Sequence, residues 1–446
     1  MIFLKKSQDR DLAFKGQVTA FLTLIFILML SVVGVLIESA SIQITKNRNR
    51  ADTILALEST FAEYHPELLE CYEIFARFGC TEAVMQNRLS YYGANHMEHT
   101  IQQKQYLTDY NGMPFYRQAV SYMKNWLGLE DMSEDSKYQF SSDREYELAE
   151  KEAGNSKELE TMLAEGEAQL PAENNPLQSV DNLKKSNLLA VLLTNQEDLS
   201  NRNVTLETLP SNRVLQEGDF VEEQSVSLSD KMFFVAYAIE HFSTMTNLRE
   251  EKALLYELEY LIGGYSTDQE NLEAVCKKIM NIRTVANYTY LLTDSTRQAE
   301  AEAMALALCS LITLPEITAV VKQALLFAWA YGESIVDTRA LLKGKKVPNV
   351  KTSESWQLQL SNLSTLGTAN EVVSEKDSMR GFSYQDYIKG LLLAEAPETL
   401  SMRALDLIES NLHIKTDQCM IRIEVRSKAN LRRGIQDIFT TTFRYQ

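Results

Sequence analysis

The chain has 446 residues, 45% of them hydrophobic and 24% charged, which is enough for one large or two medium folded domains. Lys plus Arg number 44 against 61 Asp plus Glu, and the resulting net charge of -17 repels phosphate backbones. Composition therefore argues against nucleic acid as a partner.

A long apolar segment lies near the N-terminus. From Val18 to Ile37 there are 20 residues without a charge, Phe21 among them. A helix of that length spans roughly 30 Å, the thickness of a bilayer's hydrocarbon core. A secretory signal peptide has a shorter apolar region and a small-residue cleavage site, for which ESASIQ is a poor candidate. The segment predicts a transmembrane helix over residues 17–37, with membrane lipid as a partner.

Basic residues on the two sides of this segment predict its orientation. The residues before it are Lys5, Lys6, Arg10 and Lys15, and those just after it are Lys46, Arg48 and Arg50. The small excess before the helix keeps that end in the cytoplasm, and long domains cross a membrane regardless of charge. We expect a single-pass protein of the cell membrane, with residues 1–16 as a cytoplasmic tail or leader and the large C-terminal part outside.

The helix is expected to continue beyond the membrane. From Ile54 the apolar residues recur at spacings of three and four, at Ile54, Leu57, Phe61, Tyr64 and Leu68. This periodicity predicts a helical extension over 38–65 that ends near Pro66. A helix half in the bilayer and half packed on an exported domain is the build of a type IV pilin-like subunit.

Two segments of different character follow. Residues 66–130 predict short helices, the last of which has Tyr116, Val120, Met123 and Leu127 on one face and Gly128 as its C-cap. Residues 131–180 are rich in Glu and interrupted by Gly, Pro and Asn, which indicates either a solvated helix pair or a partly disordered insertion or linker.

Residues 181–446 are predicted to form the main extracytoplasmic domain. Strand-like and turn-like pieces over 204–228 precede a helix that begins near Leu228, with Ser229 or Asp230 as its N-cap. Gly263 and Gly264 end one helix, and a capping box from Thr267 to Glu270 starts the next.

A second apolar region, residues 298–342, is interrupted by Pro315, Glu316 and Lys322. Its uninterrupted pieces are too short to span a bilayer, so we expect buried core helices. Near the C-terminus, DQCMIRIEVRS alternates as a half-buried strand does, and FTTTFRY predicts a second strand. The expected fold is α+β, mostly α, with one N-terminal transmembrane helix and a few strands near the C-terminus.

A search for chemistry finds no catalytic constellation. His96 and His99 flank Glu98, but the spacing is not that of a metalloprotease, and exposed helix histidines are the favoured interpretation. Trp329, Tyr331 and Glu333 lie close together, where aromatic residues at helical spacing indicate core rather than a pocket. No metal site, cofactor or small-molecule substrate is predicted, and we expect the protein not to be an enzyme.

The five cysteines do not form a disulfide framework, because they are odd in number and scattered. They are Cys71, Cys80, Cys276, Cys309 and Cys419. Cys71 and Cys80 are near enough to pair across a short loop, although buried free thiols are favoured.

Several segments, among them ALESTFAEYHPELLECYEIF, YLIGGYSTDQENLEAV and LFAWAYGESIVDTRALLKGKKVPNVKT, resemble an uncharacterised bacterial family of single-span membrane proteins, a domain of unknown function. The resemblance implies an association with Tad (tight adherence) pilus loci, and the N-terminus is similar to those of TadE/TadG-like pseudopilins. Other pilus or pseudopilin subunits are then candidate partners.

The same resemblance implies a processing site. A prepilin peptidase cuts after a Gly that precedes the apolar helix, and Gly16 stands in that place, so that Gln17 becomes the mature N-terminus. Type IV pilins carry Glu at the fifth mature position, which here is Phe21. The chain therefore departs from the pattern at the charge through which pilins register with their neighbours.

Three functions compete at this stage. The first is a pseudopilin-like or accessory assembly protein of a Tad/type IV-like pilus system. The second is a cell-surface binding or structural protein that keeps the helix as an uncleaved tether, and the third is an exported enzyme, which the missing motifs disfavour.

Overall fold

The structure is a computed structural model. It describes residues 3–79, 81–128, 161, 176–193, 199–221, 225–249, 252–311, 315–368, 371, 373 and 375–445. Most of the predicted acidic segment 131–180 lies outside these residues, as does Cys80, so neither that prediction nor the pairing of Cys71 is addressed.

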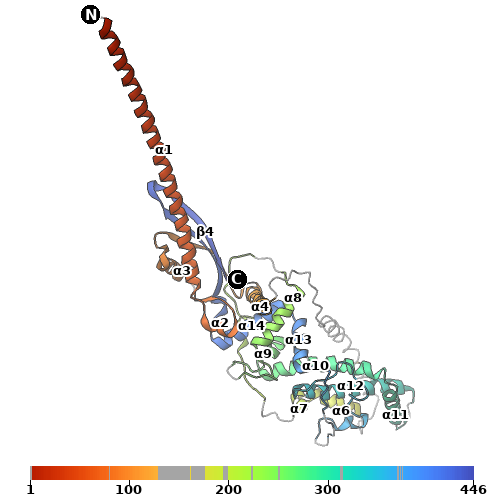
Figure 1. The fold of residues 1–446 in the computed structure, drawn as a ribbon. Coiled ribbons are helices and arrows are strands. Elements are labelled where there is room, and N and C mark those ends of the chain that lie inside the picture. The colour runs from red at the N-terminus through yellow and green to blue at the C-terminus, as the bar shows by residue number, and fades with distance from the viewer. Residues whose placement is uncertain are drawn as a thin grey trace.

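The described chain has three parts in a row (Figure 1). Helix α1 (Phe3–Phe61) projects as a single rod of 59 residues with the N-terminus at its free end. A small antiparallel sheet packs on its inner end, and a body of helices lies beyond the sheet. The C-terminus returns to the region where the sheet meets the helical body.

Helix α1 contains the apolar segment. Among the described residues one helix, Val18–Phe61, is long and apolar enough to cross a membrane, and its most apolar window is not buried at all. This confirms a candidate single-pass anchor by length and composition. The helix ends at Phe61, four residues before the His65 N-cap of α2 (Pro66–Tyr72), close to the predicted end near Pro66.

The inner end of α1 packs through a different stripe from the predicted one. Thr53, Ala56 and Thr60 are fully buried together with Leu57 and Phe61, but Ile54 is 45% exposed. Adjacent residues on a helix point roughly 100° apart, so a stripe centred on Thr53 turns Ile54 to the solvent. Small residues at the centre of the stripe permit close approach to the sheet, which the apolar periodicity alone does not indicate.

The sheet is entirely antiparallel, and β3 (Cys419–Asn430) is its central strand. It pairs with β2 (Glu98–Tyr106), with β4 (Gln436–Arg444) and with the short β1 (Arg77–Phe78). The two C-terminal strands confirm the sequence prediction. Residues 66–130, predicted to form short helices, do form α2, α3 (Glu82–Leu89) and α4 (Asp109–Trp126), but they also supply β1 and β2, which the sequence did not indicate.

The sheet, the last turns of α1 and two short helices enclose one core. We call β1 to β4, α3 (Glu82–Leu89), η1 (Ser90–Ala94) and residues 49–61 the sheet module. Its buried apolar residues include Ala56, Leu57, Phe61, Met85, Leu89, Tyr106, Ile423, Val425 and Phe439. The inner part of α1 is thus held by a core built from both ends of the chain.

The remaining described elements form the helical body. They are α2, α4 (Asp109–Trp126), α6 (Pro176–Lys185), α7 (Leu188–Leu192), α8 (Leu228–His241), α9 (Glu257–Gly263), α10 (Asp268–Leu291), α11 (Ser295–Leu311), α12 (Thr318–Leu342), α13 (Tyr384–Ala394) and α14 (Pro397–Leu412), with the 3₁₀ turns η2 (Leu206–Thr208), η3 (Pro315–Ile317), η4 (Leu360–Thr365) and η5 (Thr416–Gln418). One further 3₁₀ turn, η6 (Arg432–Gly434), belongs to the sheet module, where it joins β3 to β4. Helices α10 and α12 pack along each other at its centre (Figure 1).

Most local predictions in the helical body are confirmed. Gly264 caps α9 with a left-handed backbone, and Thr267 with Glu270 forms the capping box of α10. Helix α12 is buried rather than membrane-exposed. The N-cap of α8 is a correction, because Ser227, and not Ser229 or Asp230, accepts from the backbone N–H of Asp230.

Candidate functional site

The predicted processing and membrane residues all lie on α1. Val18, Phe21 and Ile37 are 55%, 64% and 65% exposed, and within the described chain no other element covers them. Gly16 and Gln17 belong to the same helix, while their side chains fall outside the described residues. The structure therefore groups these residues along one exposed rod and not in a pocket.

An aromatic cluster holds the inner end of α1. Phe61 stacks on Phe443 with ring centroids 4.3 Å apart and meets Tyr445 edge-on at 5.4 Å. Tyr445 also stacks on Phe75 at 5.7 Å, and its hydroxyl donates to the carbonyl of Phe61. Phe443 and Tyr445 thus hold the inner end of α1 by packing against Phe61.

Glu63, just after α1, joins three side chains of the sheet module. Its carboxylate lies 2.9 Å from Arg77 and 3.3 Å from Arg88, and it accepts a 2.6 Å hydrogen bond from the hydroxyl of Tyr92. The Tyr92 hydrogen bond and the two guanidinium groups hold the pKa of Glu63 below its usual range. The end of α1 is therefore fixed by charge as well as by aromatic packing.

The two candidate histidines, His96 and His99, lie near the other end of the α1 stretch that packs on the sheet, away from Phe61. His99 is on strand β2 and 8% exposed, between the hydroxyl of Ser427 and the carbonyl of Ala94, both at 2.9 Å. Burial lowers its pKa. The prediction of exposed helix histidines is wrong for His99, because the polar residues of β2 gave no strand signal. Within the described residues no group of His, Cys, Asp and Glu is arranged to hold a metal ion.

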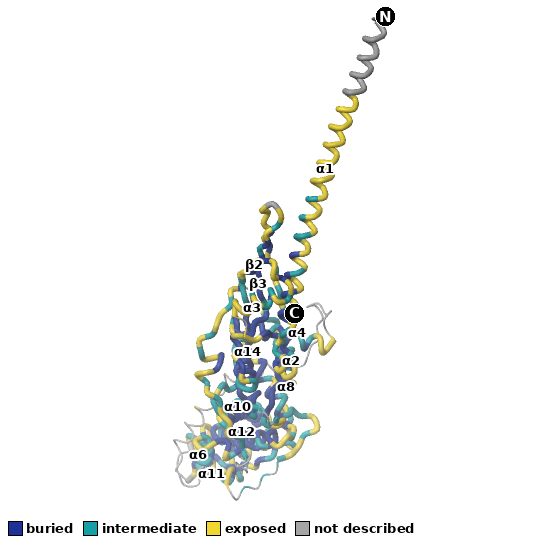
Figure 2. The backbone as a smooth tube through the Cα atoms, turned by 90° about the vertical axis from the view of Figure 1, so that its left-hand side faces the viewer, coloured by how far each residue is buried: buried dark blue, intermediate teal, exposed yellow. Residues whose placement is uncertain are grey.

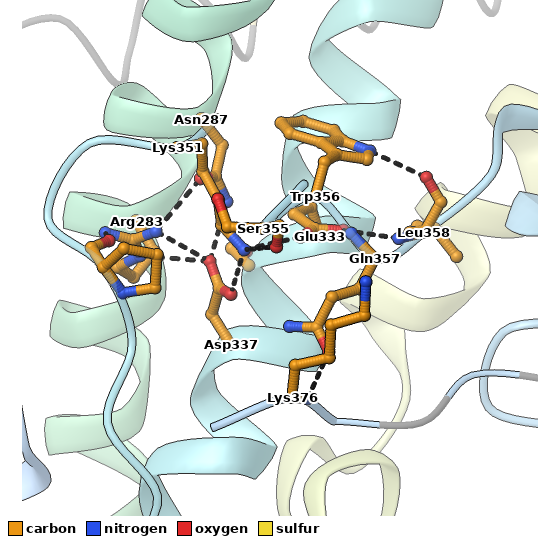
Figure 3. A network of polar contacts seen from close by, with 12 residues as sticks. Arg283, Asn287, Glu333, Asp337, Lys351, Ser355, Trp356, Gln357, Leu358 and Lys376 are labelled. Atoms are coloured by element: carbon orange, nitrogen blue, oxygen red, sulfur yellow. Dashed lines mark hydrogen bonds and ion pairs between the residues drawn. The ribbon is translucent and has the colours of Figure 1, made fainter. Parts of the chain in front are cut away.

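A buried ion network lies in the centre of the helical body (Figure 3). Lys351 places its ammonium 2.6 Å from both Glu333 and Asp337, which lie one turn apart on α12. Arg283 of α10 approaches Asp337 at 2.9 Å, and Asn287 donates to the same carboxylate at 3.1 Å. All four charged side chains are at most 1% exposed.

Backbone groups complete this network. Glu333 accepts from the N–H of Leu358 at 2.7 Å and from that of Gln357 at 3.0 Å. Arg283 donates to the carbonyls of Pro348 and Asn349 at 3.0 and 3.2 Å. The network therefore ties the long segment after α12 back onto α10 and α12.

The network has the properties of a structural brace. Two cations face two carboxylates, so the cluster is formally neutral, and each carboxylate accepts several hydrogen bonds. Burial raises the pKa of Glu333 against the opposing effect of Lys351. Burial also tends to raise the pKa of Asp337, but the nearby charges of Arg283 and Lys351 outweigh burial and hold this pKa below its usual value. Breaking one partner of such a cluster leaves an uncompensated buried charge.

Sequence reasoning singled out only Glu333 of this network. Of the two aromatic residues predicted to be core, Trp329 is buried at 1% exposed, and Tyr331 is half-buried and packs against the same core. The signal available in the sequence is that Glu333 and Asp337 stand four residues apart within an apolar helix, where isolated charges require partners. Lys351 and Arg283 carry no comparable signal, because only the fold brings them near.

Among the described residues most cysteines are buried, as favoured. Cys276 and Cys309 are buried free thiols, Cys419 is buried with its thiol 3.7 Å from the carbonyl of Lys415, and Cys71 lies on the surface. Burial raises the pKa of Cys276 far above its usual value, which makes that thiol unreactive.

Fold and site together define a protein with one N-terminal helix able to cross a membrane, a sheet module that holds this helix, and a helical body braced by buried ions. The chain belongs to DUF5702, a family of unknown function, which matches residues 166–431. The match runs from just before α6 through β3 and leaves α1 and β4 outside it. No curated protein and no solved structure matches the chain.

Proposed function

We propose that the chain is a membrane-anchored extracytoplasmic component of a Tad/type IV-like pilus system, either a pseudopilin-like subunit or an accessory assembly protein, without enzymatic activity. The observation that carries the proposal is helix α1, which continues without interruption from an exposed apolar segment into the core of the sheet module. A helix shared in this way between bilayer and folded domain is the build of a pilin-like subunit.

The packing of α1 supports a rigid connection between its two halves. Phe61 is held by Phe443 and Tyr445, and Asn49 donates to Asp437 at 3.2 Å, so β4 fixes the helix at two levels. The apolar surface from Val18 to Ile37 is then available to lipid or to helices of other pilus subunits. An orientation with the body outside is supported by the small excess of basic residues before the span, four against three just after it.

A second candidate is a cell-surface binding or structural protein tethered by an uncleaved helix. The observation that favours it is Phe21, an apolar residue at the position where pilins carry the registering carboxylate. Without that carboxylate the membrane segment serves as an anchor alone. The two candidates differ in whether the chain is cut after Gly16.

Co-expression with an active prepilin peptidase separates the two. The pilus proposal expects Gln17 as the new N-terminus, and Gly16→Leu is expected to block cleavage because a branched side chain prevents close approach of the backbone. Gly34→Leu is the matched control, since no atom lies within 4 Å of the position a side chain would take there. That variant is expected to be cut normally.

A sheared-filament preparation probed for this chain tests assembly directly. Presence of the chain in the sheared fraction supports a pseudopilin-like subunit, and its retention in the membrane with a mature Gln17 end supports an accessory role. An N-terminus that stays at Met1 while a co-expressed pilin is processed contradicts the pilus proposal and leaves the tether.

A further inference from the structure

The β3–β4 hairpin runs back along α1 toward the membrane segment. At the end of α1, Phe61 contacts Phe443, and three turns earlier Asn49 contacts Asp437. Strand β4 therefore runs parallel to α1, and the turn of the hairpin that precedes it, Leu431–Ile435, lies beyond Asn49 on the side of the apolar span. Figure 2 shows this hairpin rising beside α1 in the direction of the N-terminus.

The height of the turn follows from element geometry. The 12 residues from Asn49 back to Ile37 correspond to roughly 18 Å of helix. The two to four strand residues from Asp437 to the turn correspond to roughly 10 Å. The turn thus ends roughly 8 Å from the apolar span, about the depth of the headgroup layer on one side of a bilayer.

Basic residues gather at this level. Lys46, Arg48 and Arg50 lie on α1, and Lys428 and Arg432 lie on the hairpin. We call these five residues the basic collar. Arg48 and Lys428 are 79% and 41% exposed at their side chains, and they form ion pairs with Asp52 at 3.6 Å and Glu98 at 3.9 Å. The collar is basic on a chain whose net charge is -17.

Apolar side chains are exposed at the same level. Ile435 in the turn is 39% exposed, and Ile44 on the facing stretch of α1 is 68% exposed. Exposed aliphatic residues beside basic residues, next to a membrane span, match the mixed character of a bilayer interface. Each Lys or Arg close to an anionic surface adds to the attraction.

We propose that the basic collar and the hairpin turn bind anionic lipid headgroups, and that this contact seats the sheet module on the membrane surface. The inference rests on the anchoring of α1 in a bilayer and is independent of the pilus role. The hairpin turn then makes a second contact with the membrane beside α1. Together the two contacts fix the orientation of the helical body relative to the bilayer.

The test uses the full chain, one copy per nanodisc, in phosphatidylcholine alone or mixed with phosphatidylglycerol. Ile435→Trp places a reporter in the turn, and lipids brominated near the headgroup quench a tryptophan that reaches them. Val350→Trp is the matched control, because Val350 is 74% exposed but lies in the helical body. The parent chain corrects for Trp126, Trp329 and Trp356.

We expect the tryptophan in the turn to be quenched in the anionic nanodiscs and to be quenched less in phosphatidylcholine. The control tryptophan is expected not to be quenched in either lipid. Quenching gives the ratio of molecules whose hairpin turn contacts the bilayer to molecules whose turn does not. In the Ile435→Trp background, Lys46→Gln and Arg432→Gln are each expected to lower this ratio about fivefold in anionic nanodiscs. Lys389→Gln, 46% exposed on α13, is expected to leave that ratio unchanged.

Equal quenching in the two lipids, or none, overturns the proposal. Quenching or protection of the turn that arises only when two copies share a nanodisc also overturns it, because the occupant is then a second chain. Neither outcome depends on cleavage after Gly16, so failure here and failure of the pilus proposal are distinguishable.

Discussion

Phe61, in the last turn of α1, stacks on Phe443 of β4 with ring centroids 4.3 Å apart. Because Phe61 is fully buried, Phe61→Ala is expected to lower the free energy of unfolding by about 3–5 kcal/mol. Ile54→Ala, at a site 45% exposed on the same helix, is expected to cost far less. Urea titration of the detergent-solubilised chain followed by circular dichroism measures both, and similar costs would contradict the packed stripe.

The buried network predicts a large effect of a single lysine. Lys351→Met leaves Glu333 and Asp337 facing one cation, and we expect a loss of about 3–5 kcal/mol in the free energy of unfolding. Lys343→Met is the control, because its side chain is 43% exposed beside Glu375 and such pairs contribute about 0–1 kcal/mol.

A second substitution sharpens that test. Glu333→Gln in the Lys351→Met background restores charge balance and is expected to recover part of the lost stability, since an amide oxygen still accepts from Leu358. The brace interpretation fails if Lys351→Met costs no more than Lys343→Met.

Asp294 predicts an acid-sensitive contribution to stability. It accepts hydrogen bonds from the Tyr290 hydroxyl at 2.7 Å and from the Arg297 side chain at 2.6 Å, and these lower its pKa to about 2. A carboxyl with a lowered folded-state pKa stabilises the fold above its unfolded pKa, and this contribution is lost as pH falls toward 2. Asp294→Asn is expected to cost about 1–2 kcal/mol near pH 7.

The pH dependence distinguishes this effect from a general loss. The difference in unfolding free energy between the parent chain and Asp294→Asn is expected to shrink as pH falls from about 4 to 2. Tyr290→Phe removes the largest cause of the low pKa and is expected to shift that window upward. A difference that is constant over this range would show that the charge of Asp294 contributes nothing.

The acidic segment is predicted to be an insertion that can be deleted, and the structure moves its C-terminal boundary to before α6. The limit predicted at residue 180 falls inside α6, where Leu177 and Val180 are fully buried in the core of the helical body. We expect a chain lacking 141–175 to unfold cooperatively, whereas Leu177→Ala is expected to cost about 2–5 kcal/mol. Lys185→Ala, at a side chain 74% exposed, is the control with a small effect.

Topology is tested in protoplasts. Protease added outside intact cells is expected to cleave the chain beyond Ile42, because the body is predicted to be exported. A co-expressed cytoplasmic protein that stays intact controls for lysis. Protection of the body until the membrane is opened would reverse the orientation.

Local signals in the sequence predicted the local features of the fold. Uncharged length identified the helix that is long and apolar enough to cross a membrane, glycines and capping residues located Gly264 and the Thr267–Glu270 box, and alternation identified β3. Each of these depends on residues close together in sequence, so one stretch of chain contains the whole signal.

Features created by distant partners were not predictable in the same way. Strand β2 has a polar sequence and becomes a strand because β3 offers it hydrogen-bonding partners. Arg283 and Lys351 meet Asp337 only once α10, α12 and the following segment have packed. Likewise, packing against the sheet determines that the face of α1 around Thr53 is buried, and the hydrophobic pattern of the helix alone does not indicate this face.

The sheet that holds α1 takes β1 and β2 from before α4 and β3 and β4 from after α14, with most of the helical body between them in the chain. The elements between the two aromatic partners, from α2 through β3, are synthesised after Phe61 and before Phe443. The core around the inner end of α1 can therefore close only after the helical body has been made, and a chain that stops before β4 lacks the aromatic partner on which Phe61 stacks.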